Sequence, residues 1–209
     1  MIPKIIHCCW FGRAAKNDVI RRCRESWSAR LPDFEVREWN ESNTPLDNPY
    51  CQEAMAKGLW SKVSNFIRLH ALWQDGGIYL DTDMEVVRPF DALLGHDCFL
   101  GFQRVEEIPG WVNNAIVGAR PGHDFLRRCL DRTSAVHANT GRFELSPRIV
   151  TSVLKDLGLA RYGRQEVGDV TLYPVEAFYP FSWTESFHPE CVTADTLAIH
   201  HWNHSWKTT

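Results

Sequence analysis

The first forty residues alternate between strand and helix patterns, and this alternation limits the possible fold more than any other feature of the chain. Ile2 to Trp10 has the composition of a short buried strand that opens into a Trp-Phe-Gly turn. Apolar residues then recur at helical spacing over residues 19–31, and residues 34–39 alternate between apolar and polar. A strand, a helix and a strand in this order predict a βαβ unit and a parallel sheet.

The remainder of the chain continues this alternation without an internal repeat or a break in composition that would mark a linker. Short strands late in the chain indicate that the sheet is mixed but mainly parallel. The segment 133–145 has few apolar residues and is predicted to be a mobile loop near a substrate. We therefore expect one α/β domain over residues 1–209. Further helices are predicted over residues 48–57, 60–74, 125–132 and 146–157, and further strands over residues 78–87, 98–102, 113–119, 170–173 and 196–202.

Composition and charge argue against several classes of partner. The chain has 209 residues and a formal net charge of −3, and its Lys and Arg residues are dispersed, so we expect no nucleic-acid partner. No run approaches the roughly 20 apolar residues that a membrane helix requires. The N-terminus lacks the layout of a signal peptide. Seven cysteines without a C-x-x-C pair are typical of reduced thiols, which predicts a cytoplasmic protein.

Three carboxylates stand at the point where a predicted buried strand should end. Ile78 to Leu80 is apolar, and Asp81, Asp83 and Glu85 follow at alternate positions. Because side chains two residues apart in a strand share a face, the acids are expected to converge on one side. Hard oxygen ligands of this kind suit Mg²⁺ or Mn²⁺ holding a phosphate. The alternative is the solvated polar face of an edge strand.

The C-terminal stretch carries three histidines in five residues, at positions 200, 201 and 204, followed by Ser205 and Trp206. One imidazole, from His200 or His201, is a candidate third ligand of a metal held by Asp81 and Asp83. Ser205 and the indole N–H of Trp206 can donate to phosphate oxygens. The alternative for this stretch is a strand end with aromatic packing.

Two further positions point to a ligand at the same edge of the sheet. Trp10 stands at the carboxyl end of the first predicted strand, where open α/β sheets bind their ligands, and its ring can stack on a nucleobase. Asn65 and Arg68 lie three residues apart on the helix that leads into the acidic stretch, so both can reach one ligand. An aromatic ring, a metal-binding acidic pair and a closing tail together suit a nucleoside diphosphate attached to a sugar.

Five blocks of sequence, in this order, resemble the DXD-containing sugar-transferase family. That family includes bacterial capsule and lipopolysaccharide transferases and the yeast initiating α-1,6-mannosyltransferase, and it is related to the clostridial glucosylating toxins. The block Asp75-Gly76-Gly77-Ile78-Tyr79-Leu80-Asp81-x-Asp83 is the most specific of the five. The other blocks are Ile2-Pro3-Lys4-Ile5-Ile6-His7-x-x-Trp10-Phe11-Gly12, Ser64-Asn65-x-x-Arg68, Asn113-Asn114-Ala115-Ile116 and Ile199-His200-x-Trp202-x-x-Ser205-Trp206.

The resemblance implies a GT-A fold with a Rossmann-like nucleotide half, and a metal-dependent transfer that retains the anomeric configuration. The donor implied is a nucleotide-sugar, with a UDP-sugar favoured over GDP-mannose, and the cofactor is Mn²⁺ or Mg²⁺. The acceptor implied is a glycan or lipid-linked glycan in surface polysaccharide biosynthesis, reached by peripheral association with the inner membrane face.

The resemblance also assigns roles to single residues. Metal ligands are drawn from Asp81, Asp83, His200 and His201. Catalytic roles fall to Asp81, Asp83, Arg68 and Asn114. Contacts with the nucleotide-sugar are expected from His7, Trp10, Asn65, Arg68, Asp81, Asn113, Ser205 and Trp206.

One position departs from the family pattern: this chain has Asn65 where its relatives usually have Asp. A carboxylate accepts two hydroxyl groups of a sugar, whereas an amide both accepts and donates. The identity of the donor sugar is therefore less constrained by the resemblance than the class of reaction.

Two other functions are compatible with parts of the sequence. A glycoside hydrolase would use Asp81, Asp83 or Glu85 as its acid and nucleophile, but such enzymes need carboxylates on opposite sides of the scissile bond, about 5 to 9 Å apart. A non-catalytic carbohydrate-binding module would account for the nine tryptophans. Activity in EDTA without a nucleotide would favour the hydrolase, and glycan binding without nucleotide affinity would favour the module.

Overall fold

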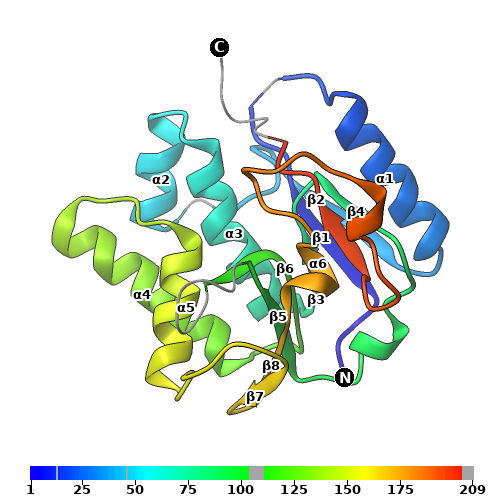
Figure 1. The fold of residues 1–209 in the computed structure, drawn as a ribbon. Coiled ribbons are helices and arrows are strands. Elements are labelled where there is room, and N and C mark those ends of the chain that lie inside the picture. Colours follow the sequence, from blue (N-terminus) through cyan, green and yellow to red (C-terminus); the bar gives the residue numbers. More distant parts are fainter. Residues whose placement is uncertain (13, 46, 104–110, 204–209) are drawn as a thin grey trace.

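A computed structural model describes residues 1–12, 14–45, 47–103 and 111–203 of the chain. Its centre is a seven-stranded sheet with the strand order β2-β1-β3-β6-β5-β8-β7, and a separate pair of strands, β4 and β9, lies beside it (Figure 1). The strands are β1 (Ile5–Cys9), β2 (Glu35–Trp39), β3 (Gly77–Leu80), β4 (Met84–Val86), β5 (Cys98–Phe102), β6 (Val112–Ala119), β7 (Gln165–Val167), β8 (Val170–Tyr173) and β9 (Ala198–His200).

The sheet is mixed with a parallel core, as the sequence predicts, but three of its six strand pairings are antiparallel. β1 pairs in parallel with both β2 and β3, so the predicted βαβ unit is present, with α1 (Asp18–Arg30) as its crossover. β6 runs antiparallel to β3 and to β5, and β8 runs parallel to β5. The edge strand β7, antiparallel to β8, has no counterpart among the predicted strands.

Two layers cover the two faces of the sheet (Figure 1). Four helices pack on one face through a core that includes Tyr79, Leu100 and Val117. α1, β4, β9 and α6 pack on the other face around Ile78 and Leu80. Neighbouring residues of β3 therefore serve opposite cores, as the period of two in a strand requires. The four helices are α2 (Pro49–Ala56), α3 (Trp60–Asp75), α4 (Asp124–Thr140) and α5 (Ser146–Asp156); the shorter helices are α6 (Val175–Phe178), η1 (Asp91–Leu93) and η2 (Pro189–Cys191).

A pair of glycines makes the connection from α3 to β3. Gly76 and Gly77 have φ angles of 67° and 106°, in the region that other residues seldom adopt. A Cβ atom at Gly77 would lie 2.6 Å from the carbonyl oxygen of Ile5 on the neighbouring strand. Glycine at both positions thus lets the helix stop and the chain enter the sheet directly beside β1.

The acidic stretch is not one continuous strand, which corrects the prediction for residues 78–87. β3 ends at Leu80, and Asp81 to Met84 form a turn in which the Met84 N–H donates to the Asp81 carbonyl at 2.9 Å. The chain then leaves the main sheet as β4 and pairs with β9. Asp and Thr favour such turns because their side chains compete for backbone hydrogen bonds.

The predicted mobile loop over residues 133–145 is also wrong, because α4 continues to Thr140. Its last turns are buried against α2: His137 contacts Glu53 at 3.0 Å, and its ring meets Tyr50 edge-on. Sparse apolar residues hid this helix, since its buried side includes Thr133 and His137. Only the short segment 141–145 connects α4 to α5.

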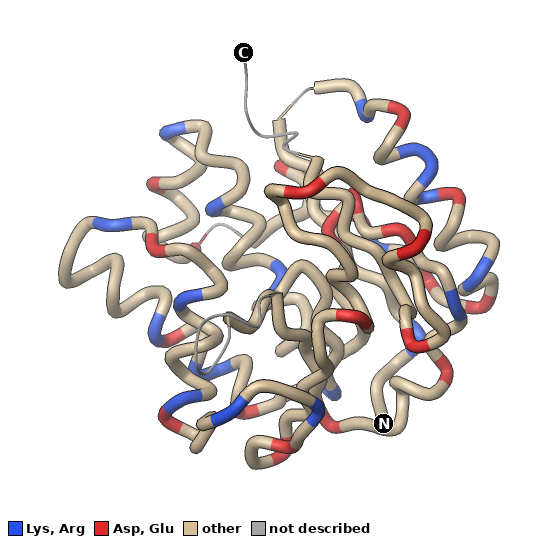
Figure 2. Tube along the Cα trace, viewed as in Figure 1, with Lys and Arg blue, Asp and Glu red and all other residues tan. Residues whose placement is uncertain are grey.

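The outward faces of the helices carry charges of both signs. Lys and Arg are interspersed with Asp and Glu along α1 and α4 (Figure 2). Some of them pair along the helix, as Arg127 does with Asp131 at 3.1 Å. Among the described residues, no helix combines the length and apolar character needed to cross a membrane.

Candidate functional site

The predicted site residues gather at one edge of the sheet because of the strand directions. β1 and β3 are parallel, so Trp10 and Asp81 follow the carboxyl ends of neighbouring strands. β6 is antiparallel to β3, with Leu80 opposite Ile116, so its amino-terminal residues Asn113 and Asn114 lie at that same edge. This is the edge at which open α/β sheets bind ligands.

Arg68 is a buried arginine that fixes Asp81 in place. Its guanidinium group lies 3.0 Å from Asp81 Oδ1 and donates to the Asn114 carbonyl at 2.7 Å. It stacks on the Tyr79 ring at 4.5 Å, and the Tyr79 hydroxyl donates to Asp81 Oδ1 at 2.9 Å. Burial works against the charged form of Arg68, but the Asp81 carboxylate outweighs burial and raises the pKa of the guanidinium. The arginine therefore remains a cation.

Asp83, in the turn between β3 and β4, is held by residues of β9 and of the segment that follows it. Its Oδ1 lies 3.3 Å from His200 Nε2, and its Oδ2 accepts from the Asn203 N–H at 2.7 Å. Its carbonyl accepts from the His201 N–H at 3.0 Å. Burial opposes charge on both members of the pair, yet their contact lowers the pKa of Asp83 and raises the pKa of His200. The pair is thus stabilised in its ionised form.

Asp81, Asp83 and His200 form a group that can hold a metal ion. One ligand atom from each residue lies within 4.8 Å of the others. Two carboxylates and an imidazole are a donor set that fits Mn²⁺, which accepts both oxygen and imidazole ligands. The side chain of Asp81 keeps 27% of its surface exposed, so the group opens toward solvent on that side.

Glu85 and His201 pair with each other, outside this group. Glu85 Oε2 lies 2.7 Å from His201 Nε2, and this hydrogen bond is the main cause that lowers the pKa of Glu85. The prediction that three acids converge on one face is therefore wrong for Glu85. Of the two candidate histidines, the structure brings His200 to the acidic pair and turns His201 away.

The two asparagines of β6 are both engaged by the protein. Asn113 donates to Gln103 at 2.7 Å and accepts from the Ala115 N–H at 2.7 Å. Asn114 is 1% exposed and donates to Ser146 Oγ at 2.6 Å. A catalytic contact of the Asn114 side chain does not fit this burial, and its visible contribution is the carbonyl that holds Arg68.

His7 lies inside the fold, so the prediction that it contacts the nucleotide does not fit the structure. The Trp39 indole N–H reaches His7 Nδ1 at 3.0 Å, and His7 Nε2 lies 2.9 Å from the Gly76 carbonyl. Both ring nitrogens are therefore used to join β2, β1 and the start of β3. Burial is the first cause that lowers its pKa, which favours the neutral ring.

Trp10 and Asn65 are both half-buried and remain available to a ligand. The Trp10 indole N–H donates to the Ala14 carbonyl at 3.1 Å, and Lys16 Nζ lies 5.4 Å from the centre of its ring. Asn65 lies one turn before Arg68 on α3. Ser205 and Trp206 lie outside the described residues.

Trp202 is a site residue to which the sequence analysis gave no role. Its ring lies 4.0 Å from the ring of His200 and 6.0 Å from that of Tyr179. With φ of 52°, it is the one non-glycine residue of the described chain in the left-handed region. Such strain concentrates at functional sites. The signal in the sequence was its place in the C-terminal block that resembles the family, two residues after His200.

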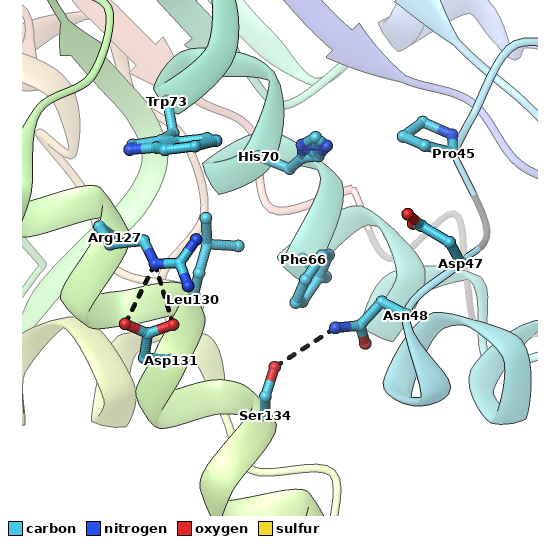
Figure 3. Close-up of a pocket in the computed structure, with 10 residues that line it drawn as sticks. All are labelled: Pro45, Asp47, Asn48, Phe66, His70, Trp73, Arg127, Leu130, Asp131 and Ser134. Atoms are coloured by element: carbon cyan, nitrogen blue, oxygen red, sulfur yellow. Dashed lines mark hydrogen bonds and ion pairs between the residues drawn. The ribbon is translucent and has the colours of Figure 1, made fainter.

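A shallow hollow of about 170 Å³ lies on the outer side of the helical layer, between α3, α4 and the start of α2 (Figure 3). His70 lines it, half-buried and edge-on to Phe66. Among the described residues, none of those predicted to bind the donor lines this hollow. Its walls are Pro45, Asp47, Asn48, Phe66, His70, Trp73, Arg127, Leu130, Asp131 and Ser134.

Comparison with known families matches both halves of the chain. Residues 17–100 match the family described as the glycosyltransferase sugar-binding region containing the DXD motif. Residues 118–209 match the alpha 1,4-glycosyltransferase conserved region. The acidic pair falls within the first match, and His200 falls within the second.

Curated relatives share close to a third of their aligned residues with this chain. Human alpha-1,4-N-acetylglucosaminyltransferase is 31% identical over 181 residues, which are 78% of this chain and 49% of that protein. Lactosylceramide 4-alpha-galactosyltransferase from Pongo pygmaeus is 30% identical over 182 residues, which are 77% of each sequence. The chain spans about half the length of most of the curated relatives it matches.

Solved structures share the GT-A fold with this chain. The PaToxG glycosyltransferase superposes with a TM-score of 0.61 at 18% identity and covers 74% of this chain and 69% of its own. The galactosyltransferase LgtC, solved with donor and acceptor sugar analogues, gives a TM-score of 0.53 at 14% identity over 96% of this chain and 87% of its own. At these identities the likeness concerns the fold alone.

Proposed function

We propose that this chain, which belongs to the DXD-motif glycosyltransferases with α-1,4-glycosyltransferase relatives, transfers a hexose from a nucleotide-sugar to an acceptor hydroxyl with retention of configuration. The observation that carries the proposal is the group of Asp81, Asp83 and His200 beside the buried Arg68, at the carboxyl edge of the sheet. A leaving nucleoside diphosphate needs positive charge at its phosphates, and this edge supplies both a metal-binding set and a fixed cation.

The donor would bind across the edge, with its base toward Trp10 and its diphosphate toward the acidic pair. The half-exposed Trp10 ring supports base stacking. We propose a UDP-sugar as the donor, with GDP-mannose as the second donor to test. Asn65, half-buried at the same edge, is the amide side chain placed to select sugar hydroxyls, whereas the buried Asn113 amide bonds to Gln103 and to the Ala115 N–H.

Mn²⁺ or Mg²⁺ bound by Asp81, Asp83 and His200 would supply a Lewis acid that neutralises charge on the leaving diphosphate. The surrounding residues fix the positions of these ligand side chains. Arg68 fixes Asp81, and the Asn203 N–H together with His200 fixes Asp83. Arg68 also remains charged beside the position of the phosphates, where it favours departure of the anion.

The proposal also covers the acceptor and the cellular setting. We propose a glycan or lipid-linked glycan acceptor in surface polysaccharide biosynthesis, in the cytoplasm, with peripheral association at the inner membrane face. The support is the family resemblance and the names of the relatives, one of which acts on lactosylceramide, a glycolipid. The domain is proposed to be a single unit over residues 1–209.

The arrangement of acids disfavours a glycoside hydrolase. Ligand atoms of Asp81 and Asp83 lie within 4.8 Å of each other and face one point, instead of flanking a bond from opposite sides. Glu85, the third acid considered, is paired with His201. A glycoside hydrolase would need two carboxylates on opposite sides of the scissile bond, and these three residues do not provide such a pair.

The test is a screen of UDP- and GDP-sugars for slow hydrolysis with Mn²⁺, with Mg²⁺ and with EDTA. We expect one donor to be hydrolysed only with metal, and Asp83→Asn to reduce that turnover at least 100-fold, as loss of a charge-stabilising group does. Asp131→Asn, an exposed acid on α4, is the control and should keep full activity. Turnover that survives EDTA, or that Asp83→Asn leaves intact, would contradict the proposal.

A further inference from the structure

The segment that follows α6 exposes two aromatic side chains. Trp183 is 52% exposed and Phe187 is 43% exposed, and they belong to a group of five large apolar residues exposed in the described chain. The other three members, Met1, Val36 and Leu145, lie in separate parts of the chain. Two exposed aromatic rings four residues apart on one segment are typical of a recognition surface.

Trp183 stands on a turn with a fixed backbone. The Glu185 N–H donates to the Ser182 carbonyl at 3.0 Å, which closes a four-residue turn with Trp183 at its second position. The Glu185 carboxylate accepts from the Ser182 N–H at 2.7 Å, and the Ser182 hydroxyl accepts from the Thr184 N–H at 3.1 Å. A ring carried by an ordered backbone loses little entropy when it binds a ligand.

The same segment is tied to the strand that carries His200. The Trp202 indole N–H donates to the Phe181 carbonyl at 2.9 Å, while the Trp202 ring lies against His200. The Phe187 ring meets His201 edge-on at 5.7 Å. Because consecutive Cα atoms are about 3.8 Å apart, the Cα atom of Trp183 lies within roughly 8 Å of that of Phe181. Trp183 therefore belongs to the segment whose Phe181 carbonyl is held by Trp202, the neighbour of His200, while Phe187 lies against His201, outside the metal-binding group.

The chemistry around these rings favours a neutral partner rich in hydroxyl groups. No Lys or Arg occurs between Arg164 and Lys207, so the segment contributes no cation of its own to attract an anionic lipid surface. The guanidinium group of Arg88 reaches the same stretch further along, at the carbonyls of Thr193 and Thr196. The two residues that follow Trp183 carry a hydroxyl (Thr184) and a carboxylate (Glu185), each hydrogen-bonded to Ser182 within the turn. Apolar ring faces next to hydroxyl and carboxylate groups match a pyranose, which has an apolar C–H face and a polar rim.

We propose that Trp183, with Phe187, is the platform on which the acceptor's sugar ring stacks. This inference rests on the proposed transferase function and names the substrate class that this segment would recognise: a neutral glycan whose terminal pyranose lies on the indole. The tie through Trp202 would then keep the acceptor in register with the metal-bound donor. The residues that hold the donor, such as Asp83 and Arg68, take no part in it.

The experiment compares Trp183→Ala with Leu145→Ala, a matched exposed apolar residue at the start of α5. Donor hydrolysis without acceptor, transfer to a panel of soluble neutral glycosides, and binding of those glycosides by saturation-transfer NMR are measured for each. We expect Trp183→Ala to raise the acceptor KM about tenfold, the usual cost of removing an anchoring tryptophan. Its donor hydrolysis should equal that of the wild type, Trp183→Phe should restore most of the acceptor affinity, and Leu145→Ala should change nothing.

The outcomes separate this inference from the function on which it rests. An unchanged acceptor KM in Trp183→Ala would overturn the inference. A fall in donor hydrolysis as large as the fall in transfer to the acceptor would also overturn it, because it would mean that the donor site is damaged. Binding to neutral or anionic vesicles is measured as well. If Trp183→Ala loses this binding while its acceptor KM is unchanged, the rings bind a lipid surface and the inference is wrong. If the wild type hydrolyses no donor, the transferase proposal fails, while glycoside binding lost in Trp183→Ala alone would still support the platform.

Discussion

At the scale of single residues, the candidate site depends on side chains that hold other side chains. Arg68 positions Asp81, and the Asn203 N–H positions Asp83, so neither acid relies on its own rotamer preference. Trp202 has the same kind of role toward His200, against whose ring it lies at 4.0 Å. Supporting contacts of this type orient metal ligands and tune their affinity.

Trp202→Ala should therefore weaken Mn²⁺ binding about 10- to 100-fold while the protein remains folded. The loss would come from freeing the His200 ring and the Phe181 carbonyl that Trp202 now holds. Electron paramagnetic resonance of Mn²⁺ measures the affinity directly, and circular dichroism checks the fold. Trp73→Ala, which changes a half-buried tryptophan of the outer hollow, is the control. Equal Mn²⁺ affinity in the two variants would contradict the role given to Trp202.

At the scale of elements, the sequence predicts most helices and strands but not the path of the chain through the acidic stretch. The run of apolar residues indicates that β3 is buried up to Leu80. It does not indicate which strand the chain pairs with after Asp83. That depends on pairing with β9, more than a hundred residues later. The sequence singles out Asp83 as a candidate ligand, but which of His200 and His201 lies beside it depends on how β9 pairs with β4.

His7 and Asn114 show a second limit of the same kind. Both lie in blocks that resemble the family's, and both are buried with their polar atoms used by Trp39, Gly76 and Ser146. A sequence block marks which residues lie near a site, but only the packing around each shows which of them face the ligand. Trp10, in contrast, follows the carboxyl end of β1 and is only half-buried, so its ring remains available to a ligand.

The connection from α3 to β3 gives a prediction at this scale. Gly77→Ala should destabilise the protein by more than about 1 kcal/mol, because its φ of 106° is unfavourable for alanine and its Cβ would lie 2.6 Å from the Ile5 carbonyl. Gly122→Ala is the matched control: its φ of 68° is also positive, but no atom lies within 4 Å of its Cβ. Urea unfolding compares the two variants. Equal losses would show that the close approach to β1 contributes nothing beyond backbone strain.

At the scale of the whole molecule, one continuous sheet joins the two halves that match separate families. β6 pairs with both β3 and β5, and the C-terminal strand β9 returns to β4 beside the acidic pair. The metal-binding group is thus assembled from residues about 120 positions apart. The parallel sheet could be predicted from the first forty residues, whereas this closure could not, since no local pattern encodes it.

One cooperative unfolding transition is expected as a result. Far-ultraviolet circular dichroism and tryptophan fluorescence should give the same urea midpoint, because the tryptophans are spread over both halves of the chain. Two separated transitions would show that residues 1–209 do not form the single domain proposed for them.

The central claim, that Asp81, Asp83 and His200 form a metal site for a nucleotide, is tested most directly by titrating UDP into the protein in a calorimeter, with and without Mn²⁺. We expect UDP to bind at least tenfold more tightly with Mn²⁺ in the wild type, because a cation held by Asp81, Asp83 and His200 would supply positive charge for the diphosphate. In Asp83→Asn the two titrations should coincide at the weaker affinity. UDP affinity that Mn²⁺ does not change in the wild type would contradict the account.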